Sequence, residues 1–177
     1  MIRTRVGYTG GTKENPTYHD LGDHSETVEL DFDPRVISYE RLLEVFFAGH
    51  DASYCRSSRQ YMSAVFYHDA DQKRTAEEAK AKEEQRAGKT VQTQILPAST
   101  FYPAEDYHQK YALQADSTVM GDFRRMYPEF RDIVGSTAAT RANAYLYGCG
   151  ELEQLQRELD GLGLSDESER RLLSRVE

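Results

Sequence analysis

The 177-residue sequence predicts an α+β fold, a plait of mixed β-sheet flanked by helices. Up to about residue 115, short segments with strand patterns alternate with helical segments, and the connections between them are short. Beyond Gln114 only helical patterns follow, and a chain of this length fits one domain. We therefore expect an α+β core at residues 1–115 and, at residues 116–177, a helical C-terminal extension of the same domain.

The strands are predicted from alternation and from β-branched or aromatic residues. Val28, Leu30 and Phe32 alternate with acidic residues, which predicts a strand whose apolar side chains face the core. Asp33-Pro34 is expected to end this strand. The other expected strands lie at residues 2–8, 61–67 and 91–95, the last ended by Pro97.

The helices are predicted from caps and apolar spacing. Ser38 is placed to cap a helix at residues 39–48. The side chains expected to face inward from it are Leu42, Leu43, Val45, Phe46 and Phe47. Residues 71–87 form a charged helix with a thin alanine stripe, solvated on one face. Further helices are expected at residues 104–114, 117–127, 136–147, 151–159 and 165–176, with Ser136 and Ser165 as N-caps.

Composition excludes several classes of function. The net charge of −8 argues against a nucleic-acid partner, which would require clustered Lys and Arg. No apolar run approaches the roughly 20 residues of a membrane helix, so no membrane partner is expected. The first residues, MIRTRVGYTG, lack the apolar region of a signal peptide, and two cysteines are too few for a disulfide scaffold. These observations predict the cytoplasm as the location.

Six motifs carry most of the remaining information. Glycine and proline punctuation explains the first two, a turn at Gly10-Gly11 that needs positive φ and a turn at Asn15-Pro16 that presents Tyr18. In chain order the motifs are GYTGG, NPTY, H-x-E, FDP-x-x-ISYE-x-LLEVF, SAVFYH and FYPAEDYHQ-x-Y. In this order and spacing they resemble the A-type peptide methionine sulfoxide reductases, the (S)-sulfoxide-specific family. The resemblance covers most of residues 5–111 and continues more thinly through STAATRANAYLYGCG.

The resemblance implies a ferredoxin-like plait as the core of the fold. It also implies a Gly-Cys-Phe-Trp-Gly motif upstream of GYTGG, whose cysteine attacks the sulfoxide sulfur. The 177 residues contain no tryptophan and no such motif, so the first strand and helix of the family are expected to be missing. A gene start assigned too late, at an internal Met, is the favoured explanation, because Ile2 enters a strand at once. A shortened paralogue is the alternative.

The resemblance assigns three residues to the sulfoxide oxygen. Tyr18 matches the NPTY tyrosine, Glu26 the glutamate of H-x-E, and Tyr61 the tyrosine before the strand that begins near Ser63. To donate a proton at neutral pH, Glu26 must be kept protonated by desolvation in a pocket, whereas the phenols need only their hydroxyl hydrogens. An aspartate that some family members place in the preceding loop is absent, and Arg56 or Ser57 occupies that region.

The two cysteines have different expected roles. Cys149 lies between glycines, where the family places recycling cysteines, so the resemblance implies a resolving thiol that forms a disulfide for thioredoxin to reduce. Cys55 is interpreted as a loop residue or, alternatively, as a substitute nucleophile activated by nearby arginines. No cofactor is expected, and His24, His50, Asp51 and Cys55 lack the spacing of a metal site.

Two functions follow from these observations. The favoured one is a peptide-methionine (S)-S-oxide reductase that acts on free or protein-bound methionine sulfoxide with thioredoxin as reductant. The 177 residues lack the family's nucleophile and are expected to be inactive unless it is supplied. The alternative is a non-catalytic relic of the reductase, or a sulfoxide-binding module, that keeps the oxygen site and reduces nothing.

Overall fold

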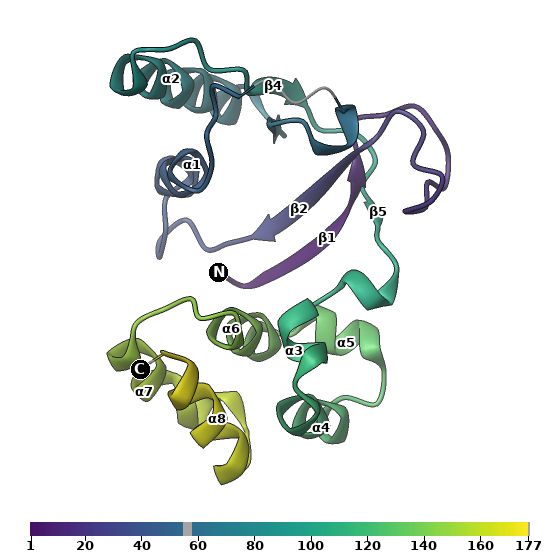
Figure 1. The fold of residues 1–177 in the computed structure, drawn as a ribbon, viewed down its shortest axis with the longest axis vertical. Helices are drawn as coiled ribbons and strands as arrows, with labels where there is room; N and C mark the ends of the chain where they lie inside the picture. The colour runs from purple at the N-terminus through teal and green to yellow at the C-terminus, as the bar shows by residue number, and fades with distance from the viewer. Residues whose placement is uncertain (55–57, 177) are drawn as a thin grey trace. The chain divides into compact units, whose positions relative to one another are not determined.

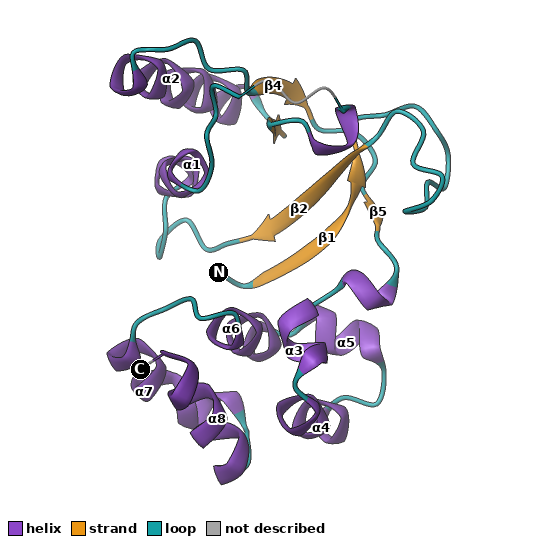
Figure 2. Cartoon of the chain, in the orientation of Figure 1, coloured by secondary structure: helices purple, strands orange, loops and turns teal. Residues whose placement is uncertain are grey.

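The computed structural model describes residues 1–54 and 58–176, and it confirms an α+β protein (Figures 1 and 2). Contacts divide the chain into two compact units. The helical unit consists of Met1–Val6, Val28–Asp31 and Glu105–Glu177, and the mixed unit consists of Gly7–Thr27 and Phe32–Ala104. The division expected from the sequence, 1–115 and 116–177, remains a prediction. Among the described residues, no helix is both long and apolar enough to cross a membrane.

The strands form two small sheets rather than one. In the first, the order is β2 (Ser25–Asp31), β1 (Arg3–Thr9), β5 (Tyr102–Pro103), and β1 pairs antiparallel with β5. In the second, β3 (Ala64–Tyr67) pairs parallel with β4 (Gln94–Pro97).

The apolar side of the predicted second strand does not face the core. Val28 is 54% exposed and Leu30 is also exposed, whereas Glu29 and Asp31 are partly buried. These two acids pair with arginines of β1, Arg3 with Asp31 and Arg5 with Glu29, so the charged side of the strand is the one that has partners. The prediction of a strand with alternating side chains is confirmed, but the prediction that its apolar side chains face the core is wrong.

The mixed unit contains two of the predicted helices, α1 (Tyr39–Ala48) and α2 (Ala70–Ala87). The predicted cap of α1 is confirmed, since Ser38 Oγ accepts a hydrogen bond from the Arg41 backbone N–H at 3.2 Å. Val45, which was expected to face inward, is exposed, so the apolar face of α1 is narrower than predicted. Phe47 of α1 belongs to a buried cluster with Ala52 and Val91.

Several elements have bounds that differ from the prediction, and the helix expected at 151–159 extends to 162. The strand expected at 61–67 begins at Ala64, because residues 59–61 form a 3-10 helix, η1 (Arg59–Tyr61). The strand expected at 91–95 lies at 94–97. Pro97 is the last residue of β4, so the predicted end of this strand is confirmed, and the Ala98 N–H donates to the Tyr67 carbonyl at 2.8 Å. The helix expected at 104–114 divides into η2 (Asp106–His108) and α3 (Tyr111–Ala115).

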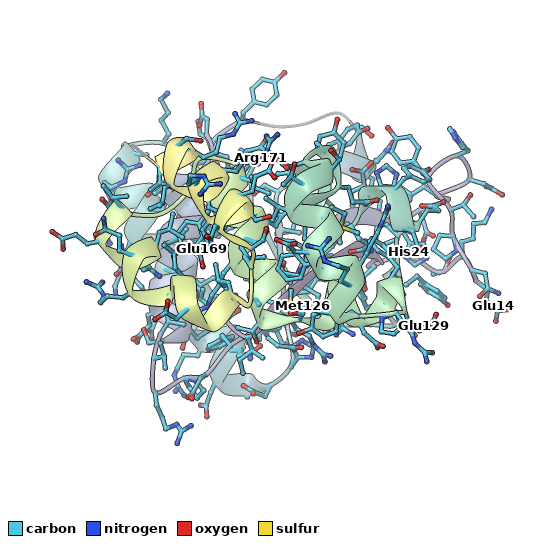
Figure 3. All side chains as sticks on the ribbon, turned by 90° about the horizontal axis from the view of Figure 1, so that it is seen from below. Glu14, His24, Met126, Glu129, Glu169 and Arg171 are labelled. Atoms are coloured by element: carbon cyan, nitrogen blue, oxygen red, sulfur yellow. The ribbon has the colours of Figure 1, made fainter. Side chains whose placement is uncertain are left out.

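The helical unit consists mainly of six helices. They are α3, α4 (Ser117–Met126), α5 (Phe130–Gly135), α6 (Thr137–Leu146), α7 (Leu152–Leu162) and α8 (Asp166–Val176). Sequence reasoning did not predict α5. Ser136 caps α6 as predicted, accepting a hydrogen bond from the Ala139 N–H at 3.2 Å. Arg171 of α8, labelled in Figure 3, donates to Asp116, the N-cap of α4.

Candidate functional site

The three residues predicted to hold an oxygen lie together in the mixed unit. Tyr18 follows the turn at Asn15-Pro16, Glu26 lies in β2, and Tyr61 ends η1. The Tyr61 side chain is hydrogen-bonded to both Tyr18 and Glu26. The structure therefore brings together side chains that are up to 43 positions apart in the sequence.

The neighbours of Tyr61 in this cluster raise the pKa of its hydroxyl group. The hydrogen bond with Tyr18 raises the pKa of Tyr61, and the nearby charge of Glu26 raises it further. Tyr61 therefore keeps its hydroxyl hydrogen over the physiological pH range. Tyr61 is nonetheless 47% exposed and Glu26 is exposed. Glu26 therefore does not lie in the enclosed pocket that the sequence predicts around it.

Sequence reasoning missed a fourth member of the cluster, Gln60. Its side-chain Nε2 donates to Glu26 Oε1 at 2.6 Å and to the Tyr61 hydroxyl at 3.1 Å. The only sequence signal for it is its position directly before Tyr61. Gln60, Glu26, Tyr61 and Tyr18 are called the oxygen cluster below.

The glycine turn is fixed by the residues that precede Glu26. Gly10 has the positive φ predicted for it, 82°. His24, labelled in Figure 3, is buried and accepts a hydrogen bond at Nδ1 from the Gly11 N–H, at 3.2 Å. Nε2 therefore carries the hydrogen and donates to the Lys13 carbonyl at 2.8 Å. His24 thus holds the segment that leads to Tyr18.

The Asp23 carboxylate also binds the backbone that follows the glycine turn. Its carboxylate accepts hydrogen bonds from the backbone of Thr12 at 2.7 Å and of Lys13 at 3.3 Å. The bond from the Thr12 N–H is the main cause of a pKa for Asp23 lowered to about 2. Asp23 therefore remains a negatively charged acceptor for this turn across the ordinary pH range.

Arg59 and Ser25 link the remaining pieces. Ser25 Oγ donates to the Arg59 carbonyl at 2.8 Å, and Arg59 Nη2 donates to the Gly10 carbonyl at 2.7 Å. The start of η1 is therefore tied to β2, one residue before Glu26, and to the glycine turn. These bonds set the distance between the element that carries Tyr61 and the strand that carries Glu26.

The predicted resolving cysteine lies in the helical unit. Cys149 is an exposed free thiol between Gly148 and Gly150, just after α6. Its role remains a prediction. Cys55, the alternative nucleophile, lies outside the described residues.

This geometry defines a class of site. Two phenols, a carboxyl group and an amide converge in the mixed unit, and hydroxyl and amide hydrogens suit a ligand with a strongly polar oxygen. Within residues 1–54 and 58–176, no group of three or more His, Cys, Asp or Glu side chains is placed to hold a metal ion. The cluster therefore presents hydrogen-bond donors side by side, and its role in binding an oxygen remains a prediction.

Comparison with known proteins gives the family. The sequence model of the family described as peptide methionine sulfoxide reductase matches residues 1–129, and the chain belongs to this family. A peptide methionine sulfoxide reductase of Drosophila melanogaster is 41% identical over 167 residues, which cover 93% of this chain and 67% of that protein. Peptide methionine sulfoxide reductase MsrA of Methanococcoides burtonii is 46% identical over 123 residues, which cover 63% of this chain and 80% of that protein.

Solved structures agree with this assignment. Mxr1 from Saccharomyces cerevisiae in its reduced form superposes with a TM-score of 0.59 at 27% identity, over 64% of this chain and 70% of that one. Methionine sulfoxide reductase A of Corynebacterium diphtheriae gives a TM-score of 0.55 at 31% identity, over 65% of this chain and 64% of that one. Among curated relatives, the chain spans 67% of the length of the fruit fly protein and 59% of that of peptide methionine sulfoxide reductase A5 from Oryza sativa subsp. japonica.

Proposed function

We propose that the protein is a peptide-methionine (S)-S-oxide reductase of the cytoplasm, acting on free or protein-bound methionine sulfoxide, with thioredoxin as reductant. The observation that carries the proposal is the convergence of Tyr18 and Glu26 on the Tyr61 hydroxyl. Family membership supports the substrate class. The (S) configuration and the reductant rest on the family resemblance.

The reaction moves one oxygen from carbon-bound sulfur to a cysteine. A thiolate attacks the sulfoxide sulfur and forms an S–S bond while the sulfoxide oxygen gains protons. That oxygen then passes to the cysteine sulfur as the S–O and S–S bonds break, and the products are methionine and a cysteine sulfenic acid. The resolving thiol then attacks the sulfenic sulfur, a disulfide forms and water leaves. Cys149 is our proposed resolving thiol. The attacking cysteine is the one in the family's Gly-Cys-Phe-Trp-Gly motif, which the 177 residues do not contain.

The oxygen cluster acts on the departing oxygen. Negative charge grows on that oxygen as the thiolate attacks, so groups that donate hydrogen bonds to it stabilise the transition state more than the substrate. Tyr18 and Tyr61 donate their hydroxyl hydrogens. Glu26, when protonated, supplies the proton that the oxygen gains.

Binding tests the proposal on the chain as it stands. The titrants are N-acetyl-methionine (S)-sulfoxide, its (R) epimer and N-acetyl-methionine, followed by NMR of tyrosine ring carbons. We expect the (S)-sulfoxide to shift Tyr18 and Tyr61 together, the epimer to bind more weakly and the thioether not to bind. Tyr18→Phe and Tyr61→Phe should each weaken binding. Equal shifts with sulfoxide and thioether, or none, would contradict the proposal.

A second candidate function is a sulfoxide-binding module that reduces nothing. Two observations favour it: the exposure of Glu26 and the lack of the nucleophile motif among the 177 residues. The two functions separate when the protein is isolated from its source organism and incubated with racemic methyl p-tolyl sulfoxide and dithiothreitol. Loss of one enantiomer indicates a reductase, whereas binding without turnover indicates the module.

A further inference from the structure

The side-chain amide of Gln60 donates hydrogen bonds to two members of the oxygen cluster at once. Its amide nitrogen carries two hydrogens and has no capacity to accept, and it lies between two members of the oxygen cluster. One bond goes to Glu26 Oε1 at 2.6 Å, and the other goes to the Tyr61 hydroxyl oxygen at 3.1 Å. Both partners therefore have one acceptor position occupied by Gln60.

We propose that Gln60 is a positioning residue that determines where the cluster's own hydrogens point. This inference rests on the proposed function, because it concerns how the same site presents hydrogens to a sulfoxide oxygen. The ligand class is an organic sulfoxide, and the residue acts on it through Glu26 and Tyr61.

On Glu26, Gln60 decides which carboxyl oxygen keeps the proton. A hydrogen on Oε1 directed at Gln60 would meet an amide hydrogen across only 2.6 Å, so a protonated Glu26 carries its hydrogen on Oε2. The amide also restricts rotation of the carboxyl group. The acidic hydrogen is thereby held on the oxygen that Gln60 does not occupy.

On Tyr61, Gln60 acts in the same sense. The hydroxyl oxygen accepts from Gln60, so its single hydrogen points away from the amide, toward Tyr18 in the free protein. A sulfoxide oxygen placed among these groups takes over that hydrogen. The donor is aimed in advance, and little orientational freedom is lost when the ligand binds.

The backbone around Gln60 keeps the amide in place. In η1 the Tyr61 N–H donates to the Ser58 carbonyl at 3.3 Å, and the Met62 N–H donates to the Arg59 carbonyl at 3.2 Å. The same Arg59 carbonyl accepts from Ser25 Oγ at 2.8 Å. Because Ser25 directly precedes Glu26, one short network fixes both ends of the Gln60–Glu26 bond.

Gln60→Met tests the inference, since it preserves the length of the side chain and removes both donors. Gln92→Met is the matched control, because Gln92 is an exposed glutamine of the same mixed unit. Two readouts are taken by NMR: the affinity for N-acetyl-methionine (S)-sulfoxide and the pH titration of the Tyr61 ring. Thermal unfolding of each variant shows whether the fold is retained.

We expect Gln60→Met to bind the sulfoxide about tenfold more weakly, the size of one hydrogen bond, and to titrate Tyr61 above the wild type, because the Gln60 amide donates to the Tyr61 oxygen and favours its charged form. Gln92→Met should match the wild type in both. Wild-type affinity and an unchanged Tyr61 titration in Gln60→Met would overturn the inference and leave the proposed function intact. Failure of the wild type itself to bind any sulfoxide would overturn the proposed function and the role of Gln60 with it.

Discussion

Within each of the two units of this protein, a different kind of interaction holds the structure in place. The helical unit has a continuous apolar core, in which Leu113, Phe123, Leu155 and Leu172 are fully buried. Around the oxygen cluster of the mixed unit, turns and side chains are fixed by hydrogen bonds to backbone groups instead. Apolar burial is strong but not directional, whereas hydrogen bonds fix angles. The stability of the helical unit therefore depends on apolar core residues, whereas the geometry of the oxygen cluster depends on hydrogen-bonding residues.

The largest effect is expected in the core of the helical unit. Phe123→Ala removes a fully buried ring and should lower the free energy of unfolding by about 3–5 kcal/mol, as measured by urea denaturation. Tyr147→Ala, at a side chain that is 73% exposed in the same unit, serves as control and should change it by less than about 0.5 kcal/mol. Similar losses for both variants would contradict the role assigned to this core.

A buried cation provides the second test of the helical unit. Lys110 Nζ donates to the Thr4 carbonyl at 2.7 Å and to Thr140 Oγ1 at 2.9 Å, with no carboxylate among the partners found for it in the described chain. Burial, with a smaller effect of Arg5, lowers the pKa of Lys110 from 10.5 to about 8. Between these values the unfolded chain binds the proton and the folded one does not, so stability rises with pH.

Lowering the pKa of Lys110 from 10.5 to about 8 corresponds to a gain in the free energy of unfolding on the order of 3 kcal/mol between pH 8 and 10.5. The measurement is urea denaturation at several pH values, with the wild type compared with Lys110→Met. We expect the wild type to gain stability relative to the variant across this window. Parallel pH profiles would mean that Lys110 is not desolvated in the folded protein.

The third prediction returns to the turn in the mixed unit. A Cβ on Gly11 would lie 2.7 Å from both the Asp23 backbone carbon and His24 Cδ2, so Gly11→Ala must displace backbone. We expect a loss of about 1–3 kcal/mol and faster amide hydrogen exchange near the turn. Gly135→Ala is the control in the helical unit, where the added Cβ meets open space and should be neutral or slightly stabilising. Equal effects of the two substitutions would remove the contrast between the units.

The smallest effects are expected at two helix N-caps, one in each unit. Ser38 and Ser136 cap α1 and α6 with bonds of the same length, 3.2 Å. Each change to Ala should lower the free energy of unfolding by about 1 kcal/mol. Conservative Ser→Thr variants, which keep the hydroxyl, should restore most of it. A much larger loss at one cap would show that this helix contributes more to its unit than local capping explains.

Sequence reasoning succeeded where a local signal decides the structure. The helix at 39–48 was predicted with its bounds because Ser38 and the apolar spacing lie within a few residues of one another. It failed where the deciding partner is distant. On β2 the partly buried side carries Glu29 and Asp31, which pair with arginines of β1, and alternation alone does not distinguish the two faces.

The same distinction applies to the site. Tyr18, Glu26 and Tyr61 were found through motifs, and the structure places them in one hydrogen-bonded cluster. Gln60 was not predicted, because its role depends on a hydrogen bond from its side-chain amide to Glu26 in β2. Neither composition nor periodicity indicates such a contact. The exposure of Glu26 was not predicted either, since burial depends on which other residues cover the strand.

The two phenols and the carboxyl group act as one cluster, and a pH titration of the tyrosine ring carbons by NMR distinguishes this from three independent side chains. The wild type, Tyr18→Phe and Glu26→Gln are compared. We expect Tyr61 to titrate above the ordinary tyrosine pKa of 10.0 in the wild type and each substitution to lower its midpoint, Tyr18→Phe most. A wild-type Tyr61 that titrates at the ordinary value, and does so unchanged in both variants, would contradict it.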